Sequence, residues 1–130
     1  MGQQQLLLIV LGVIVVGIAV VVGINLFNAN SVSSNRDGVV SDLNNLGAMA
    51  QQFYKKPTSM GGGGNAFTGN GQTWALPLEL DTTANGSYAA TVNAQSVSIV
   101  GTGNEKNSAG LAIQHTATVS PTAISVALTR

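Results

Sequence analysis

The pattern of apolar and polar positions divides the chain near residue 28. From Leu6 to Phe27 the sequence LLLIVLGVIVVGIAVVVGINLF has no charge and no proline, and its first strongly polar side chain is Asn25. A helix over this run is ~33 Å long, enough to cross a hydrocarbon layer of about 30 Å. The run is longer than the apolar part of a secretory signal, and MGQQQ before it has no positive charge. The pattern predicts a helix surrounded by lipid or by other helices.

After Phe27 the helical period continues, but only one face stays apolar. Apolar residues recur every three or four positions, with polar residues between them. They are Val32, Val39, Val40, Leu43, Leu46, Ala50, Phe53 and Tyr54. Lys55 and Lys56 precede Pro57, which is typical of a helix C-terminus. We therefore predict one helix over residues 1–56, apolar on all sides in residues 1–27 and amphipathic in residues 28–56.

The rest of the chain has the pattern of loops and strands. Residues 57–73 form a connector rich in Gly and Asn, with neither helical nor strand period. Residues 74–130 contain short alternating segments, which predict a small antiparallel domain of three or four strands. The expected segments are Trp74–Leu80 (an edge or extended loop because of Pro77), Ser87–Asn93, Ser96–Val100, Leu111–Val119 and Ala123–Leu128, with a turn at Asn85-Gly86 and a loop over 101–110.

Each expected strand has one apolar face, which needs a cover. Alternation places on these faces Val97 and Ile99, then Leu111, Ile113, His115, Ala117 and Val119, and finally Ile124, Val126 and Leu128. The amphipathic part of the helix supplies this cover, because Leu43, Leu46, Ala50 and Phe53 point the same way. The predicted fold class is α+β: a long N-terminal α-helix packed on a small antiparallel β-sheet.

Charge is scarce in this chain. Five Lys and Arg balance five Asp and Glu, and only 8% of the residues are charged. Nucleic-acid binding needs clustered cations, so we expect no nucleic-acid partner. An uncharged polar surface is weakly protected against association and suits a protein that packs into an array. The chain has no cysteine, which excludes disulfides and thiolate chemistry.

Candidate chemistry is sparse, and we expect no enzyme, no metal and no cofactor. Gly61–Gly64 lacks the Lys-Ser/Thr of a phosphate loop and is better explained as a connector. His115 has no second ligand at metal-binding spacing, and Glu79 and Asp81 are explained by a solvated loop.

Two surface features have a structural and a functional interpretation. Trp74 is expected to pack the loop onto the sheet or onto a neighbouring subunit, with sugar stacking as the alternative. Asn85-Gly86-Ser87 matches the acceptor pattern for glycosylation at Asn85, although a turn explains the same residues.

An apolar N-terminal helix that continues into an amphipathic helix and then packs on a small antiparallel sheet resembles the type IV pilin family. The resemblance covers the layout of the whole chain. Its sequence-specific part lies in residues 1–27, where Met1-Gly2 and a short polar lead precede LLLIVLGVIVVGIAVVV.

The resemblance implies a subunit that the helix holds in the cytoplasmic membrane. A prepilin peptidase would cut it after a glycine, and the pilus assembly machinery would polymerise identical copies into an extracellular helical filament on the cell surface. The apolar helices would bundle as the filament core. The implied core residues are Gln5, Leu6, Leu7, Leu8, Ile9, Val10, Leu11, Val13, Ile14, Val15, Val16, Ile18, Val20, Val21, Val22, Ile24, Leu26 and Phe27.

The chain departs from the family pattern at three points. The family's acidic residue near the mature N-terminus is replaced by Gln5 if the mature chain starts at Met1, or by Leu7 if it starts at Gln3. An amide costs less than a carboxylate in a dry core and still bonds a neighbour's terminal amine, which favours the Met1 register. The C-terminal disulfide loop is absent. So is the helix proline of many pilins, which leaves Gly12, Gly17 and Gly23 as points where the helix could unwind or neighbours could approach.

The main hypothesis is a major pilin. The alternatives are a single-pass anchor that holds an extracytoplasmic β binding module, and a minor pilin or pseudopilin of a secretion machine. The amphipathic helix favours both pilin hypotheses, because a simple anchor needs no rod beyond the bilayer.

Overall fold

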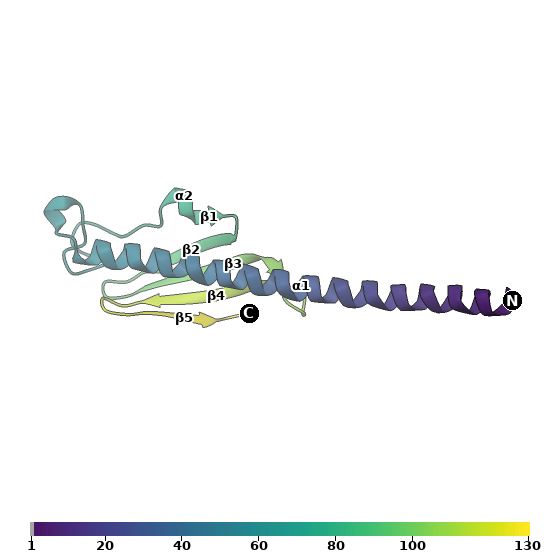
Figure 1. Ribbon diagram of the computed structural model, residues 1–130. Helices are drawn as coiled ribbons and strands as arrows, with labels where there is room; N and C mark the ends of the chain where they lie inside the picture. Colours follow the sequence, from purple (N-terminus) through teal and green to yellow (C-terminus); the bar gives the residue numbers. More distant parts are fainter. Residues whose placement is uncertain (1) are drawn as a thin grey trace.

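A computed structural model, which describes residues 2–130, shows one long helix lying along a sheet (Figure 1). Helix α1 runs from Gly2 to Lys55 without a break. Its C-terminal half crosses the sheet, and its N-terminal half projects beyond the sheet as a rod. The helix ends one residue before the expected end, and the α+β fold class is confirmed.

Five strands follow in a simple antiparallel meander. They are β1 (Thr82–Thr83), β2 (Gly86–Val92), β3 (Val97–Lys106), β4 (Ala112–Val119) and β5 (Ile124–Leu128). Each strand pairs with its neighbour in sequence, in the order β1-β2-β3-β4-β5. The sheet therefore has five strands, whereas three or four were predicted. Strand β1 was not predicted because its two residues are too few to show an alternating pattern.

The core lies between α1 and the sheet. From the helix it takes Val39, Leu43, Leu46 and Ala50, which are at most 1% exposed. The strands contribute a matching set that includes Val97, Ile99, Ala117 and Val119. The predicted apolar stripe is thus confirmed for Leu43, Leu46 and Ala50, while Phe53 is half-buried at its end.

The prediction of a loop over residues 101–110 is wrong in its first half, because β3 continues to Lys106. Gly101 and Gly103 occupy inward positions where alternation would call for apolar side chains. A Cβ atom at Gly101 would lie 2.9 Å from Val39 Cγ1, and one at Gly103 would collide with Asn35 Oδ1. At these two strand positions α1 leaves no room for a larger side chain, whereas in the local sequence such glycines are typical of a loop.

The segment before the sheet also differs from the prediction. Thr58–Met60 form a short 3-10 helix, η1, in the connector. Leu78–Asp81 form a short helix, α2, which begins inside the expected extended segment Trp74–Leu80 and ends one residue beyond it. The connector is packed: Phe67 is fully buried, and its ring centroid lies 5.0 Å from that of Tyr54. Trp74 is 5% exposed in the same core, which confirms its expected packing role.

The later strands keep the predicted phase. Ile113, His115, Ala117 and Val119 alternate inward along β4, as expected. Leu111 is the exception, because it lies before β4 and is exposed. In β5, Ile124 and Val126 are half-buried against the core, and Leu128 is largely exposed.

Candidate functional site

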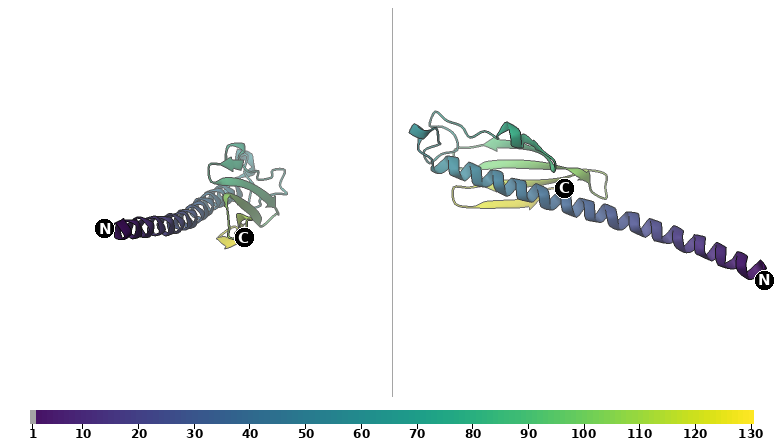
Figure 2. Two further views of the ribbon diagram at one scale, coloured as in Figure 1. Left: turned by 90° about the vertical axis from the view of Figure 1, so that its right-hand side faces the viewer. Right: turned by 45° about the horizontal axis from the view of Figure 1, so that its top comes forward.

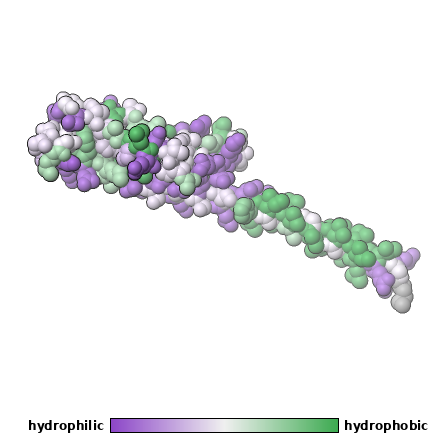
Figure 3. All heavy atoms as spheres, turned by 90° about the horizontal axis from the view of Figure 1, so that it is seen from above, coloured by the Kyte–Doolittle hydropathy of each residue, from purple (hydrophilic) through white to green (hydrophobic). Residues whose placement is uncertain are grey.

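The most unusual surface of the molecule is the bare N-terminal half of α1. Every large apolar side chain from Leu6 to Phe27 is between 52% and 72% exposed. Figure 3 shows this rod as a continuous apolar surface that ends where the polar head begins. It is the only helix among residues 2–130 that is long and apolar enough to cross a membrane, and its most apolar window has a mean hydropathy of 3.3.

This surface cannot remain in water. Covering one Val, Leu or Ile side chain is worth about 1.5–3 kcal/mol, and the rod carries such side chains on all sides. None of the window is buried by the described part of the chain. The cover must therefore come from outside the subunit, either from lipid or from other helices. The helix can thus support membrane anchoring or filament assembly.

All the residues expected to form an assembly core, from Gln5 to Phe27, lie on this exposed rod. Their role in assembly stays a prediction. Helix α1 is continuous through Gly12, Gly17 and Gly23, and a Cβ atom at any of them would meet nothing within 4 Å. Unwinding at these glycines, or close approach of a neighbour, also stays a prediction.

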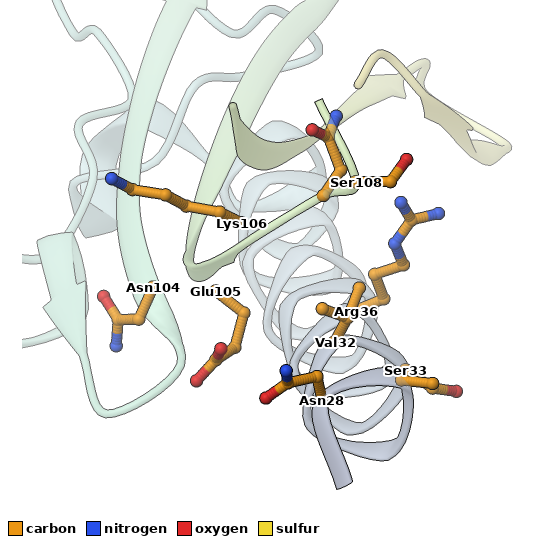
Figure 4. Close-up of a pocket in the computed structure, with 10 residues that line it drawn as sticks. Asn28, Val32, Ser33, Arg36, Asn104, Glu105, Lys106 and Ser108 are labelled. Carbon is orange, nitrogen blue, oxygen red and sulfur yellow. The ribbon is translucent and has the colours of Figure 1, made fainter. Parts of the chain in front are cut away.

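A groove of about 830 Å³ lies where the rod meets the head. Residues 28–36 of α1 form one wall, and the β3–β4 hairpin at 104–108 forms the other (Figure 4). Ala29 and Val32 contribute apolar surface, and Asn, Ser and charged side chains surround them. Arg36 points toward Ser108, whereas Lys106 points away from it, so the two cations do not converge on one ligand.

A polar cluster fastens the other half of α1 to the first hairpin. Asp42 Oδ2 accepts hydrogen bonds from Thr83 Oγ1 at 2.8 Å, Asn85 Nδ2 at 3.1 Å and Tyr88 Oη at 2.6 Å. Burial raises the pKa of Asp42, but the three hydrogen bonds outweigh it and hold the pKa below its ordinary value of 3.8. Burial and the bond to Asp42 raise the pKa of Tyr88, so its hydroxyl stays a donor. This cluster is not predictable from the sequence pattern, because Asp42 lies among the polar positions of the helix.

The other candidate residues are placed as follows. His115 is 7% exposed on the inward face of β4, and burial followed by the nearby Arg36 lowers its pKa. Within residues 2–130, no group of three or more His, Cys, Asp or Glu could hold a metal ion. Glu79 and Asp81 lie on α2 and are exposed. The side-chain nitrogen of Asn85, the atom that glycosylation would modify, donates to Asp42.

No protein-family model, no curated protein and no solved structure matches this chain. The class of protein therefore follows from geometry: an α+β head on a helix able to cross a membrane. This layout is compatible with a pilin-like fold.

Proposed function

We propose that this chain is the major subunit of a type IV pilus-like filament, with a structural and not an enzymatic role. The observation that carries the proposal is the continuity of α1. One unbroken helix supplies both the exposed apolar rod and the central element of the head. A helix of this kind ties each head rigidly to whatever covers its rod, and a filament needs that connection.

Assembly follows from moving the rod between two apolar environments. In the cytoplasmic membrane, lipid covers it; in an extracellular filament, the rods of neighbouring copies do. Relative to water, burying on the order of 1,000 Å² of apolar surface is worth roughly 25 kcal/mol before association costs. Head-to-tail contacts that do not close on themselves produce an open helix. A prepilin peptidase and an assembly machine would be the partners that move the chain between these states.

Two alternatives use the same geometry. In the described chain, side-chain hydrogen bonds between α1 and the head begin only at Asn35, so the rod would serve equally well as the anchor of a β binding module. A minor pilin or pseudopilin would have the same fold at lower abundance. The continuation of α1 across the whole head favours the two pilin proposals over the anchor.

The first test is electron microscopy of material sheared from cells, combined with the intact mass of the subunit. We expect thin filaments that contain this chain, and a mass that fixes Met1 or Gln3 as the mature N-terminus. A chain found only in membranes, with no filaments, would contradict the major-pilin proposal and support the anchored module.

The second test places a charge in the rod. A lysine at the middle of a membrane helix costs about 2.5–3.5 kcal/mol, and an unpaired one in a helical core is also unfavourable. Val15→Lys is therefore expected to reduce surface filaments at least tenfold. Asn44→Lys adds the same charge to the exposed face of the other half of α1 and is expected to leave filaments at wild-type number. Equal losses in both variants would count against the rod as the assembly element.

A further inference from the structure

The groove at the junction of the rod and the head contains an arginine that is not fully bonded within its own subunit. Arg36 Nε is buried, but it has no hydrogen-bond partner among residues 2–130. The side chain is half-buried and points across the groove toward Ser108 (Figure 4). A buried N–H group without an acceptor costs free energy, so nearly all such groups in native structures are paired. Arg36 therefore has donor capacity that the described part of the subunit leaves unused.

His115 lies close to Arg36 and lacks a partner in the same way. It is 7% exposed on the inward face of β4, and its Nδ1 is buried with no hydrogen-bond partner among residues 2–130. Burial lowers the pKa of His115, and the positive charge of Arg36 lowers it further. No carboxylate contributes to this shift, so the Arg36 charge acts on His115 without an anion of the described chain beside it.

The charges that line the groove leave one positive charge in excess. Besides Arg36, the charged residues of the lining are Glu105 and Lys106, which have opposite signs. Lys106 points away from Ser108, so Arg36 is the cation on that side of the groove. Ala29 and Val32 form an apolar wall beside it. The groove therefore suits a ligand that joins an anionic group to an apolar part.

The groove also lies at the level of a membrane surface when the rod crosses a bilayer. The apolar run ends at Phe27, and Val32 lies ~8 Å further along the helix axis. The polar headgroup layer on each side of a bilayer is roughly 5–8 Å thick. Figure 2 shows that the β3–β4 hairpin extends further toward the rod than the other strands do. Leu111, just after the tip of this hairpin, is 48% exposed. The groove and the hairpin tip therefore face the lipid headgroups.

We propose that the groove binds the headgroup of a membrane phospholipid, with the phosphate on Arg36. The guanidinium donates to the phosphate oxygens, and Ser108 on the opposite wall supplies a hydroxyl. The first acyl carbons lie on Ala29 and Val32, which continue the apolar surface of the rod. The bound lipid holds the head against the bilayer before assembly. The inference rests on the membrane stage of the proposed function, which the anchored module shares.

The test measures how much phospholipid the full chain retains. The chain is extracted in mild detergent from vesicles of phosphatidylethanolamine and phosphatidylglycerol, and native mass spectrometry counts the phospholipids bound to each chain. Arg36→Gln is expected to reduce retention about fivefold, because one basic residue near a membrane surface contributes roughly that factor in affinity. Arg36→Lys keeps the charge but loses the planar set of donors, so its retention is expected to lie between the two.

Two controls separate the groove from the rest of the molecule. Lys55→Gln removes one positive charge from the exposed far end of α1 and is expected to retain phospholipid like the wild type. Diacylglycerol has the acyl chains without the phosphate, so it reports lipid that binds to the rod alone. We expect the wild type and Arg36→Gln to retain it equally. The fluorescence of the buried Trp74 shows that each variant is folded.

Equal phospholipid retention by the wild type, Arg36→Gln and Arg36→Lys would overturn the inference. So would displacement of the lipid by an excess of inorganic phosphate, because the groove would then be a site for a free anion. Loss of filaments in Arg36→Gln with unchanged retention would also overturn it, and would assign Arg36 to a contact with a second copy, such as the exposed Glu79 and Asp81. Arg36-dependent retention by a chain that forms no filaments would support the inference and overturn the major-pilin proposal.

Discussion

The two halves of α1 belong to one helix but have opposite relations to the rest of the chain. Between Leu6 and Phe27 the large apolar side chains are all more than half exposed, and the described chain covers none of them. Between Val39 and Ala50 a narrow stripe is almost completely buried against the sheet. The helix is therefore held by its own subunit at one end, and at the other end its own subunit covers none of its large apolar side chains.

The two halves of α1 also differ in their hydrogen bonds to the head. Asn35 Nδ2 donates to the Asn85 carbonyl at 2.7 Å, and Gln51 Nε2 donates to the Ser120 carbonyl at 3.0 Å. Together with the Asp42 cluster, these bonds fasten the second half along its length. Among residues 2–130, no side-chain hydrogen bond joins residues 2–30 to the head. We expect the head and the second half of α1 to unfold as one unit that excludes the rod.

The largest difference between the two halves is expected when one leucine side chain in each half is truncated to alanine. Leu43→Ala leaves a cavity under a fully buried side chain and is expected to lower the free energy of unfolding of the head by about 2–5 kcal/mol. Leu11→Ala truncates a side chain that is 55% exposed, and is expected to leave head unfolding unchanged. Denaturant unfolding of the full chain in detergent, followed by the fluorescence of the buried Trp74, measures both. A Leu11→Ala effect as large as that of Leu43→Ala would show that the halves are not independent.

A smaller effect is expected at Asp42, whose charge holds the hairpin to the second half. Asp42→Asn weakens hydrogen bonds to a charged acceptor and is expected to cost about 1–3 kcal/mol. Because the pKa of Asp42 is lowered on folding, its contribution is complete above about pH 5 and is lost as pH falls through the ordinary value toward the folded one. The wild-type head should thus lose stability below about pH 5 more steeply than the variant.

Asp37→Asn is the matched control, because Asp37 is exposed on the same helix. Its free energy of unfolding at pH 7 is expected to equal that of the wild type. Identical pH profiles for the wild type and Asp42→Asn would show that the Asp42 carboxylate does not stabilise the head.

The same contrast shows what the sequence could predict. Where apolar residues repeat with a regular period, most of the prediction is confirmed: the apolar run, the Leu43–Ala50 stripe and the inward alternation from Ile113 to Val119 are all present. The alternation fails only at its ends, where Leu111 and Leu128 are exposed. Single-sequence patterns failed where contacts distant in the chain decide the structure. The local sequence predicts a loop at Gly101 and Gly103, because the close approach of α1 to β3 is not visible in it.

The other features of the structure that the sequence did not predict are either short or polar. Helix α2 and strand β1 contain too few residues to establish a period. The Asp42 cluster joins residues 41 to 46 positions apart, and an aspartate on the polar side of a helix is ordinarily solvated. The rod, by contrast, could be identified from the sequence, because its apolar run is continuous over residues 6–24.

The smallest effect is expected from adding one methyl group to a glycine in each half. In a helix interior, alanine is favoured over glycine by about 1 kcal/mol. At Gly47, a Cβ atom would lie 3.0 Å from Ile124 Cδ1, so Ile124 must shift on the edge strand β5. The packing cost offsets the helix gain, and Gly47→Ala is expected to destabilise the head by about 1 kcal/mol or less.

Gly12→Ala meets no atom of its own subunit and lies outside the unit that unfolds with the head, so the unfolding of the head should not change. Its effect depends on what covers the rod. Lipid adapts to an added methyl group, whereas a helix packed closely against Gly12 cannot. Filaments that shorten or disappear in Gly12→Ala, with the head still at wild-type stability, would locate a close contact between copies at this residue. Normal filaments would show that neighbouring helices in the assembly do not touch this face of the rod.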